Sequence, residues 1–228
     1  MRCFVFTLLA CFSLFFANLQ AQSYTFQHES LPCLNKKFTI VAHIFKDTLG
    51  NYGVAEADII KAVQDMNPFF APICVSFEVC EFRYHDNKQH DILEDTNTEL
   101  PQLKTQYHAD RRINMYFVTF FSSDIGACGN ADLGGIGNPT SSGILIRKDC
   151  VNARTFAHEM GHFFSLQHTF EGNGTELVNG TNCTTAGDGL CDTPADPYIP
   201  TEPLSSYVDD NCVFISPKTD ANGEYYNP

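Results

Sequence analysis

Basic residues are scarce in this chain. Its 228 residues include 14 lysines and arginines against 27 aspartates and glutamates, which gives a formal net charge of −13 at pH 7. No basic patch occurs that could neutralise a phosphate backbone, and anionic membranes would repel a surface of this sign. The composition therefore argues against nucleic-acid and membrane partners. An acidic surface either favours cationic substrates or serves solubility in a secretory setting.

The apolar run at the N-terminus is too short to favour a membrane anchor. Residues 3–17 are apolar, follow one basic residue, Arg2, and give way abruptly to polar sequence. We expect a secretory signal peptide over residues 1–21, cleaved after the small residue Ala21. The residues up to Cys11 faintly resemble a lipoprotein cleavage box, but the apolar run continues past them. The prediction is a secreted, extracellular protein.

Nucleotide-binding motifs are missing. Residues 126–137 are rich in glycine (G-A-C-G-N-A-D-L-G-G-I-G), but no G-K-S/T follows to form a phosphate loop. The glycines do not open a helix after a strand either, which argues against a dinucleotide site. Removing the 21 signal residues from 228 leaves 207. That length is consistent with one domain, or with one domain and an incomplete part.

What the chain does contain is a dense group of histidines in residues 155–171, T-F-A-H-E-M-G-H-F-F-S-L-Q-H-T-F-E. His158 and His162 are four residues apart, so on a helix their imidazoles point to one side and can hold a metal ion. His168 can join them only if the helix ends near Ser165 and the chain turns back. Three imidazoles with an open fourth position are typical of catalytic zinc.

Glu159 directly follows the first of these histidines. On a helix it is displaced by about 100° and lies beside the metal, where a carboxylate can take a proton from water that the metal activates. It is the candidate general base. A plainer alternative is an amphipathic core helix that happens to carry histidines. Its apolar face would consist of Phe156, Met160, Phe163, Phe164 and Leu166.

The spacing H-E-x-x-H-x-x-S-x-x-H resembles the metzincin signature, in which glycine stands where this chain has Ser165. The similarity is closer to the pappalysin-like metalloproteases, whose zinc helix also runs into H-T-F, as at residues 168–170. Their later D-T-P resembles residues 192–194. The resemblance covers roughly residue 37 to the C-terminus and is strong over residues 156–197. It implies a secreted zinc metalloendopeptidase that hydrolyses peptide bonds in a protein or peptide substrate.

The resemblance also implies a fold, the α+β zincin fold of metzincins. We expect a twisted, mixed, mostly parallel sheet with a backing helix and an active-site helix, followed by an irregular C-terminal subdomain. The glycine-rich segment would form an edge of the sheet above the cleft, where a substrate backbone can pair with it. The expected domains are an N-terminal extension over residues 22–36 and a catalytic domain over residues 37–228.

The residue pattern predicts the elements themselves. Apolar, β-rich runs indicate strands, and one helically spaced apolar face indicates a helix that Pro68 ends. The strands cover residues 37–46, 73–82, 113–121 and 143–147, the helix covers residues 55–66, and Asn152 is the expected N-cap of the zinc helix. His43 is expected to be a hydrogen-bonded core residue. Residues 85–112, which hold His85, His90 and His108, are expected to be solvated loop.

Eight cysteines remain after signal cleavage, and in an exported chain these are mostly disulfides. They are Cys33, Cys74, Cys80, Cys128, Cys150, Cys183, Cys191 and Cys212. The sequence alone does not pair them. The resemblance suggests that Cys183 pairs with Cys212. It also suggests that Cys191 has its partner just after the Met-turn, the methionine-bearing turn that lies beneath the zinc in metzincins. Cys33 is expected in a disulfide, and its alternative is a thiolate that caps the zinc in a latent enzyme.

Two departures from the family bear on these expectations. Serine in place of glycine at position 165 costs on the order of 1 kcal/mol if the backbone φ there is positive. The last methionine is Met160, so the methionine-bearing turn beneath the zinc of metzincins is missing. We therefore expect a fragment that ends before that turn.

The resemblance further implies structural calcium in the loop that carries Asp188, Asp192 and Asp196, where carboxylates can surround a hard cation. The alternative is a turn-rich loop in which aspartates make local hydrogen bonds. A second class of function also stays open, a non-catalytic secreted zinc-binding or adhesion module derived from a protease. The presence of Glu159 argues against it, because a purely structural zinc site does not need that carboxylate.

Overall fold

The computed structural model describes residues 31–123, 126–138 and 140–227. The predicted signal peptide, residues 1–21, and residues 22–30 of the predicted extension lie outside the described residues. The chain divides after Leu31, and the described helices and strands all belong to the unit Pro32–Pro228. None of the described helices has the length and apolarity needed to cross a membrane.

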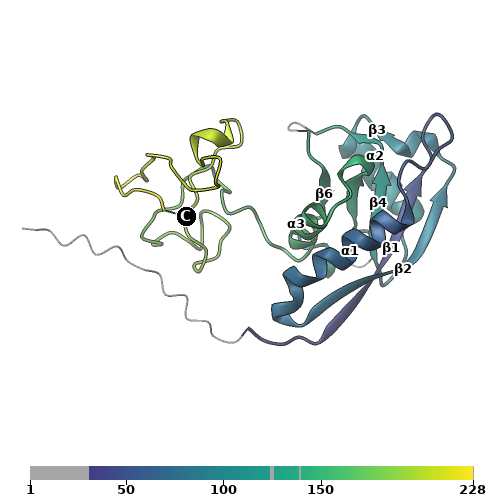
Figure 1. The fold of residues 1–228 in the computed structure, drawn as a ribbon, viewed down its shortest axis with the longest axis horizontal. Helices are drawn as coiled ribbons and strands as arrows, with labels where there is room; N and C mark the ends of the chain where they lie inside the picture. The colour runs from purple at the N-terminus through teal and green to yellow at the C-terminus, as the bar shows by residue number, and fades with distance from the viewer. Residues whose placement is uncertain (1–30, 124–125, 139, 228) are drawn as a thin grey trace, which may run out of the picture. The chain divides into compact units, whose positions relative to one another are not determined.

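A five-stranded sheet forms the centre of this unit, in the order β2-β1-β4-β7-β6 (Figure 1). The first four strands in this order run parallel, and only β6 at the edge is antiparallel to its neighbour β7. Their bounds are β1 Lys36–Phe45, β2 Val75–His85, β4 Ile113–Val118, β6 Gly129–Ala131 and β7 Ile144–Arg147. A separate parallel pair joins β3 Ile92–Leu93 to β5 Phe120–Phe121. The predicted mixed, mostly parallel sheet is confirmed, as is the glycine-rich segment at its edge.

The central strands are buried on both faces, which parallel sheets require because helices cover them. In β1, consecutive residues from Ile40 to Phe45 are all buried, and the whole of β4 is buried as well. The apolar run over residues 37–46, which predicted a strand, is continuous because β1 is buried on both faces of the sheet. The prediction is confirmed to within one residue at each end.

Helices α1 (Glu56–Phe70) and α3 (Ala153–Phe163) cover the same face of the sheet (Figure 1). Ile59, Val63 and Met66 of α1 are spaced for one helical face and are fully or almost fully buried there. The helix α1 is therefore the predicted backing helix. It lies against α3 and helps to fix the position of the helix that carries the histidines.

The prediction that Pro68 ends the first helix is wrong, because α1 continues through it to Phe70. Proline costs one hydrogen bond at this place, in the last turn. Two contacts offset the loss: the Asn67 side chain exchanges two hydrogen bonds with the backbone of Phe77, at 2.7 and 3.1 Å, and the Phe70 ring packs on the Phe77 ring at 4.9 Å. Tertiary contacts thus override the local breaker.

The opposite face of the sheet is covered by α2 (Thr96–Tyr107), a helix within residues 85–112 that the sequence pattern did not predict. Only Leu100, Leu103 and Lys104 of its 12 residues are buried, so it carries no wide apolar face. The two leucines pack into a second core cluster against the sheet. This cluster contains Phe45, Leu93, Leu100, Leu103, Tyr116, Val118, Phe121 and Leu145.

His43 is fully buried, and the prediction of a hydrogen-bonded core histidine is confirmed. Its Nε2 lies 3.0 Å from Asn114 Oδ1, and its Nδ1 lies 3.0 Å from His85 Nε2. Because Asn114 Oδ1 can only accept, the proton of His43 is on Nε2, and His43 Nδ1 accepts from His85. Burial lowers the pKa of both histidines to about 4. The solvated-loop prediction is wrong for His90, which is 7% exposed, and for the half-buried His85.

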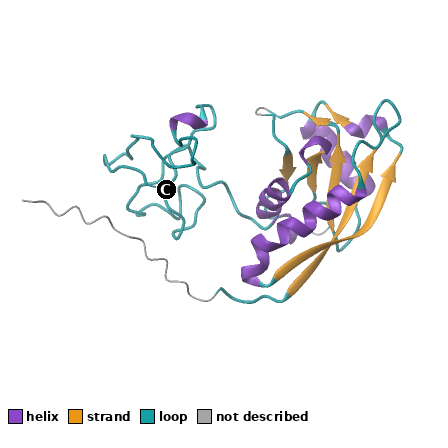
Figure 2. Ribbon diagram, viewed as in Figure 1, coloured by secondary structure: helices purple, strands orange, loops and turns teal. Residues whose placement is uncertain are grey.

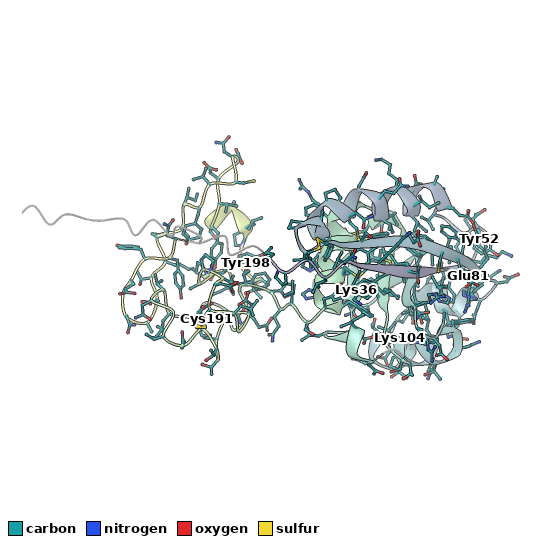
Figure 3. All side chains as sticks on the ribbon, turned by 90° about the horizontal axis from the view of Figure 1, so that it is seen from below. Lys36, Tyr52, Glu81, Lys104, Cys191 and Tyr198 are labelled. Carbon is teal, nitrogen blue, oxygen red and sulfur yellow. A yellow bond between two sulfur atoms is a disulfide. The ribbon has the colours of Figure 1, made fainter. Side chains whose placement is uncertain are left out.

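Three disulfides are present among the described residues, and one corrects an expectation. Cys183 pairs with Cys191, whereas the resemblance suggested Cys212. The chain turns twice between the paired residues, at Gly187 and Gly189 with positive φ, which brings their Cα atoms to 5.0 Å. Cys191 is labelled in Figure 3. The other disulfides are Cys33–Cys74, which confirms the disulfide expected for Cys33, and Cys128–Cys150, while Cys80 and Cys212 are free.

Described residues beyond α3 contain almost no regular secondary structure (Figure 2). One short 3-10 helix, Leu204–Ser206, and two isolated bridges are all that the described part of this segment contains. Aspartates order its hairpins: Asp209 Oδ1 accepts from the backbone two and four residues on, at 2.9 Å each, and Asp220 Oδ1 does the same at 2.8 and 2.9 Å. The predicted irregular C-terminal part is confirmed.

Candidate metal centre

Helix α3 presents two different sides. Phe156, Met160 and Phe163 are buried in the core beside α1, as the amphipathic-helix alternative required, but Leu166 of its expected apolar face is 51% exposed. His158 and His162 lie on the less buried side, one exposed and one half-buried. The helix is therefore both an amphipathic core helix and a candidate metal-binding helix, with its apolar residues in the core and its histidines available to a ligand.

The start of α3 is fixed by a cap. Asn152 Oδ1 accepts hydrogen bonds from the backbone N–H groups of Arg154 and Thr155, both at 3.0 Å, which confirms Asn152 as the N-cap. Such a cap stabilises a helix by about 1 kcal/mol. It sets the register in which the two histidines, one turn apart, face the same side.

The end of α3 turns the chain back toward the histidines. Ser165 adopts φ +79°, its N–H bonds to His162 O, and the N–H of Leu166 bonds to Gly161 O, each at 2.9 Å. This pair of bonds is a Schellman motif with serine at the position where glycine is usual. The predicted stop near Ser165 is confirmed, and φ is positive there, the condition under which serine was expected to cost on the order of 1 kcal/mol. The motif is what allows His168 to return.

The three imidazoles meet at one point. The distance from His162 Nε2 to His158 Nε2 is 3.1 Å, from His162 Nε2 to His168 Nε2 is 3.2 Å, and from His168 Nε2 to His158 Nε2 is 3.4 Å. Within the described ranges, this is the single cluster of three or more histidine, cysteine or acidic side chains close enough to hold one metal ion. The other described histidines are not part of it.

The donor set fits a metal ion. His162 Nδ1 lies 2.7 Å from the carbonyl oxygen of Leu166, which only accepts, so the ring proton is on Nδ1 and Nε2 carries a bare lone pair. Nε2 of His162 is therefore free to bind a metal ion, and the Nε2 atoms of His158 and His168 lie close enough to bind the same ion. Tetrahedral zinc, with Zn–N bonds of about 2.0–2.1 Å, places its nitrogens about 3.4 Å apart.

His168 has supports of its own. Its ring stacks on Phe170 with centroids 4.7 Å apart, and its Nδ1 lies 3.8 Å from a carboxylate oxygen of Glu171. The neighbouring Thr169 hydroxyl donates to Asp196 Oδ2 at 2.6 Å, which connects the third histidine to the later D-T-P region. Burial lowers the pKa of His168 and of His158, and neighbouring histidines add to the effect. Neutral imidazoles are the form that binds metal.

Glu159 is 5% exposed and is directed away from solvent, toward strand β6. Burial raises the pKa of its carboxyl to about 7. Its side chain fills the space beside Gly129, where a Cβ atom would lie only 2.6 Å from Glu159 Cγ. A carboxyl whose pKa lies near neutrality can exchange protons with a reacting group at physiological pH.

Sequence reasoning missed two supports of this site. The carbonyl of Leu166, which orients His162, carries no side-chain signal, because a backbone group is supplied by any residue. The role of Gly129 depends on a contact between residues 30 positions apart in the chain, Gly129 and Glu159. The glycine itself was visible in the sequence, but its neighbour was not.

The aspartates of the proposed calcium loop make local hydrogen bonds. Asp188 Oδ1 accepts from the N–H of Leu190 at 2.9 Å, and Asp196 Oδ1 accepts from the N–H of Tyr198 at 2.9 Å. This is the turn-rich alternative for these two residues. Glu176, which is 3% exposed, is the most buried carboxylate among the described residues after α3.

A mixed sheet with helices and three converging histidines, two of them on an H-E-x-x-H helix, is typical of metal-dependent peptidases. The chain belongs to metallo-peptidase family M12, whose family model matches residues 36–213, most of the chain.

Individual relatives are more distant. An extracellular metalloprotease of Colletotrichum graminicola is 48% identical over 42 residues, which span 18% of this chain and 12% of that protein. Mirolysin in complex with compound 9 matches with a TM-score of 0.48 at 15% identity, over 71% of this chain and 70% of that one. Metalloproteinase-II from Bacteroides fragilis matches with a TM-score of 0.44 at 14% identity, over 73% and 48%. Likenesses at this level concern the fold alone and carry no argument about function.

Proposed function

We propose that this chain is a secreted, zinc-dependent, pappalysin-like endopeptidase. His158, His162 and His168 are the zinc ligands, and Glu159 is the general base. The observation that supports this most directly is the approach of three Nε2 atoms to within 3.4 Å of one another, beside one buried carboxyl. A structural zinc site has no need of that carboxyl.

The chemistry divides between ion and protein. Zinc held by the three rings supplies a Lewis acid that acidifies water and polarises a carbonyl oxygen. Glu159 accepts the proton of the attacking water and passes it to the leaving amide nitrogen, so that the peptide bond breaks to a carboxylate and an amine. Leu166 O keeps the Nδ1 proton on His162 and so keeps Nε2 available as a ligand.

Strand β6 is proposed to bind the substrate backbone. It pairs with β7 on one side only and is the last strand of the sheet, so the other row of its backbone groups is available to an added strand. Gly129, Asn130 and Ala131 have no bulky side chain that would obstruct such pairing. Substrates would therefore be protein or peptide segments in extended conformation.

Calcium is proposed as a structural cofactor of the C-terminal part, with Glu176 among its ligands. Glu176 Oε2 is buried without a hydrogen-bond partner among the described residues, and it lies against Gly187, next to Asp188. Burial raises the pKa of Glu176, and the charges of Asp188 and Asp196 raise it further. A hard cation would remove this penalty. Calcium should raise the melting temperature of the wild type but not of Glu176→Gln.

Secretion and domain boundaries complete the proposal. The N-terminal sequence pattern supports a signal peptide over residues 1–21, followed by an extension over residues 22–36. The family match over residues 36–213 supports a catalytic domain over residues 37–228. Three disulfides are typical of an exported chain. N-terminal sequencing of the protein secreted by an expression host should begin at Gln22.

The test compares wild type with Glu159→Gln. Both proteins are assayed for zinc by mass spectrometry and for cleavage of a quenched-fluorescent peptide library and of unfolded casein. We expect equal zinc content and a loss of activity of roughly 100-fold or more in the variant. Equal zinc and no cleavage by either protein would support the non-catalytic zinc-binding or adhesion module instead. Equal cleavage by both would refute Glu159 as the general base.

A further inference from the structure

Backbone pairing and a disulfide fix the position of Gly129, the first residue of the edge strand β6. Gly129 is buried and pairs with Ile146 of β7. The preceding residue, Cys128, accepts a hydrogen bond from the N–H of Arg147 at 2.9 Å and is joined by a disulfide to Cys150, just before α3. The backbone at position 129 therefore has little freedom to move away from α3.

The space above Gly129 is occupied by Glu159. A Cβ atom at position 129 would lie 2.6 Å from Glu159 Cγ and 2.7 Å from its Cδ and Oε1. Such distances are well below van der Waals contact, so a methyl group at position 129 and the present position of the carboxyl exclude each other.

The backbone of α3 cannot yield either. Phe156 and Met160, on either side of Glu159 along the helix, are fully buried in the core, and Asn152 caps the helix start. Because strand and helix are both fixed, the flexible side chain of Glu159 is the part that would move. The three heavy atoms nearest to an added Cβ at position 129 all belong to Glu159, so Glu159 is the first side chain that this methyl group would displace.

We propose that Gly129 is a positioning residue for Glu159: the missing side chain at the start of β6 is what places the general-base carboxyl beside the metal site. The inference rests on the proposed function, because it concerns the reaction that Glu159 serves. It assigns to the edge strand a second role, besides pairing with substrate. One added carbon at position 129 should displace the base and leave the metal ligands in place.

The chain offers matched controls. Gly137, in the short 3-10 helix Gly135–Gly137 after β6, has nothing within 4 Å of an added Cβ and needs no positive φ. Gly135 starts the same short helix, but a Cβ there would meet the Phe163 ring at 2.5 Å. Gly137→Ala tests for the effect of alanine as such. Gly135→Ala tests for a clash with α3 that does not involve the carboxyl.

The experiment measures kcat, KM, zinc content and melting temperature of the three variants on the best peptide from the library. For Gly129→Ala we expect kcat to fall roughly 10- to 100-fold, since misplacement by about 1 Å has effects of this size, with KM and zinc content near wild type. Gly137→Ala should match wild type, and Gly135→Ala should lose melting temperature more than kcat. A Gly129→Ala protein with zinc and with kcat within twofold of wild type would overturn the inference.

A double-variant cycle separates positioning from general damage. Glu159→Asp shortens the side chain by one carbon, so adding Gly129→Ala to it should cost several-fold less kcat than adding Gly129→Ala to wild type. If Gly129→Ala does not fold, Glu159→Asp should restore folding, and failure to do so contradicts the inference. The proposed function fails separately, when Glu159→Gln keeps full activity.

Discussion

Two regions of this molecule are ordered by different means. From β1 to α3 the chain buries apolar side chains on both faces of a sheet, in two clusters that contain most of the buried hydrophobic residues. After α3 the buried hydrophobic residues are few: Cys183, Ala195, Tyr207 and Tyr226. There, aspartate-capped turns, one disulfide and a Lys218–Glu202–Tyr207 network hold the backbone. Packing orders the first region, and specific polar contacts order the second.

The proposed metal ligands come from both regions. His158 and His162 belong to α3, which is anchored in the apolar core, and His168 belongs to the irregular segment that follows it. Aromatic contacts continue from His168 through Phe170 and Tyr198, which is labelled in Figure 3, with centroid distances of 4.7 and 5.0 Å. Metal binding should therefore contribute more to order in the second region than in the first.

The largest effect is expected from a cavity in the first region. Phe156→Ala removes a fully buried ring that packs near Phe117, and such changes cost about 3–5 kcal/mol of unfolding free energy. Urea unfolding of the two proteins measures it. Phe69→Ala is the matched control, because that ring is 59% exposed and its loss should cost under about 1 kcal/mol. Similar losses in both would contradict the assignment of this core.

Acidification should lower the free energy of unfolding by up to about 3 kcal/mol through a residue of the first region. The pKa of His43 is lowered to about 4 in the folded protein, against 6.5 in the unfolded chain. The cause is burial first, with the charges of His85 and Arg83 adding to it, while Asn114 and Glu81 oppose it. Between these two values the unfolded chain binds more protons, so stability is full above pH 6.5 and is lost as the pH falls toward 4.

Urea midpoints at pH 7 and pH 5 for wild type and His43→Gln measure this effect. The wild type should lose more stability than the variant on acidification, because the variant has no group to protonate at this position. An equal loss in both would assign the acid sensitivity to other groups. His85, whose pKa burial also lowers to about 4, acts in the same direction in both proteins.

In the second region, the disulfide should matter more than any single apolar contact. Replacing Cys183 and Cys191 by serine opens a loop with a sequence separation of 8 and should cost about 2–3 kcal/mol by the chain-entropy argument. Hydrogen exchange should show the loss in residues 170–227 and leave β1 and β4 protected. Cys80→Ser is the control, since Cys80 forms no disulfide. Loss of protection in the sheet would contradict the division into two regions.

The smallest effect on stability is expected at Ser165, which lies between the two regions at the end of α3. Ser165 has φ +79°, so Ser165→Gly should stabilise the protein by about 1 kcal/mol, because glycine adopts this conformation without the Cβ clash. Ser165→Ala keeps the Cβ atom and should give no gain. Melting temperatures of the three proteins decide the matter. A gain for alanine equal to that for glycine would show that the backbone conformation is not the cause.

The metal site could be predicted from the sequence because it is local. Its three histidines, its helix cap and its turn at Ser165 all lie within residues 152–168, where helical geometry relates His158 to His162 and one turn brings His168 back to them. The parallel strands could be predicted for the same reason, from continuous apolar runs such as residues 40–45.

What could not be predicted depends on contacts between distant residues. The helix α2 has two buried leucines and forms because the sheet offers them a partner, which no window of its own sequence shows. The Cys183–Cys191 pairing follows from two turns with positive φ, and the position of Glu159 depends on Gly129. Local rules predict that Pro68 ends the helix, but α1 continues to Phe70, whose ring packs on Phe77.

The most direct test of the central claim is a crystal structure of the zinc-loaded protein with data collected at the zinc absorption edge. We predict one anomalous peak at about 2.0–2.1 Å from the Nε2 atoms of His158, His162 and His168, with the Glu159 carboxyl beside it. A zinc ion bound by only two of these rings, with His168 turned away from it, would contradict the account.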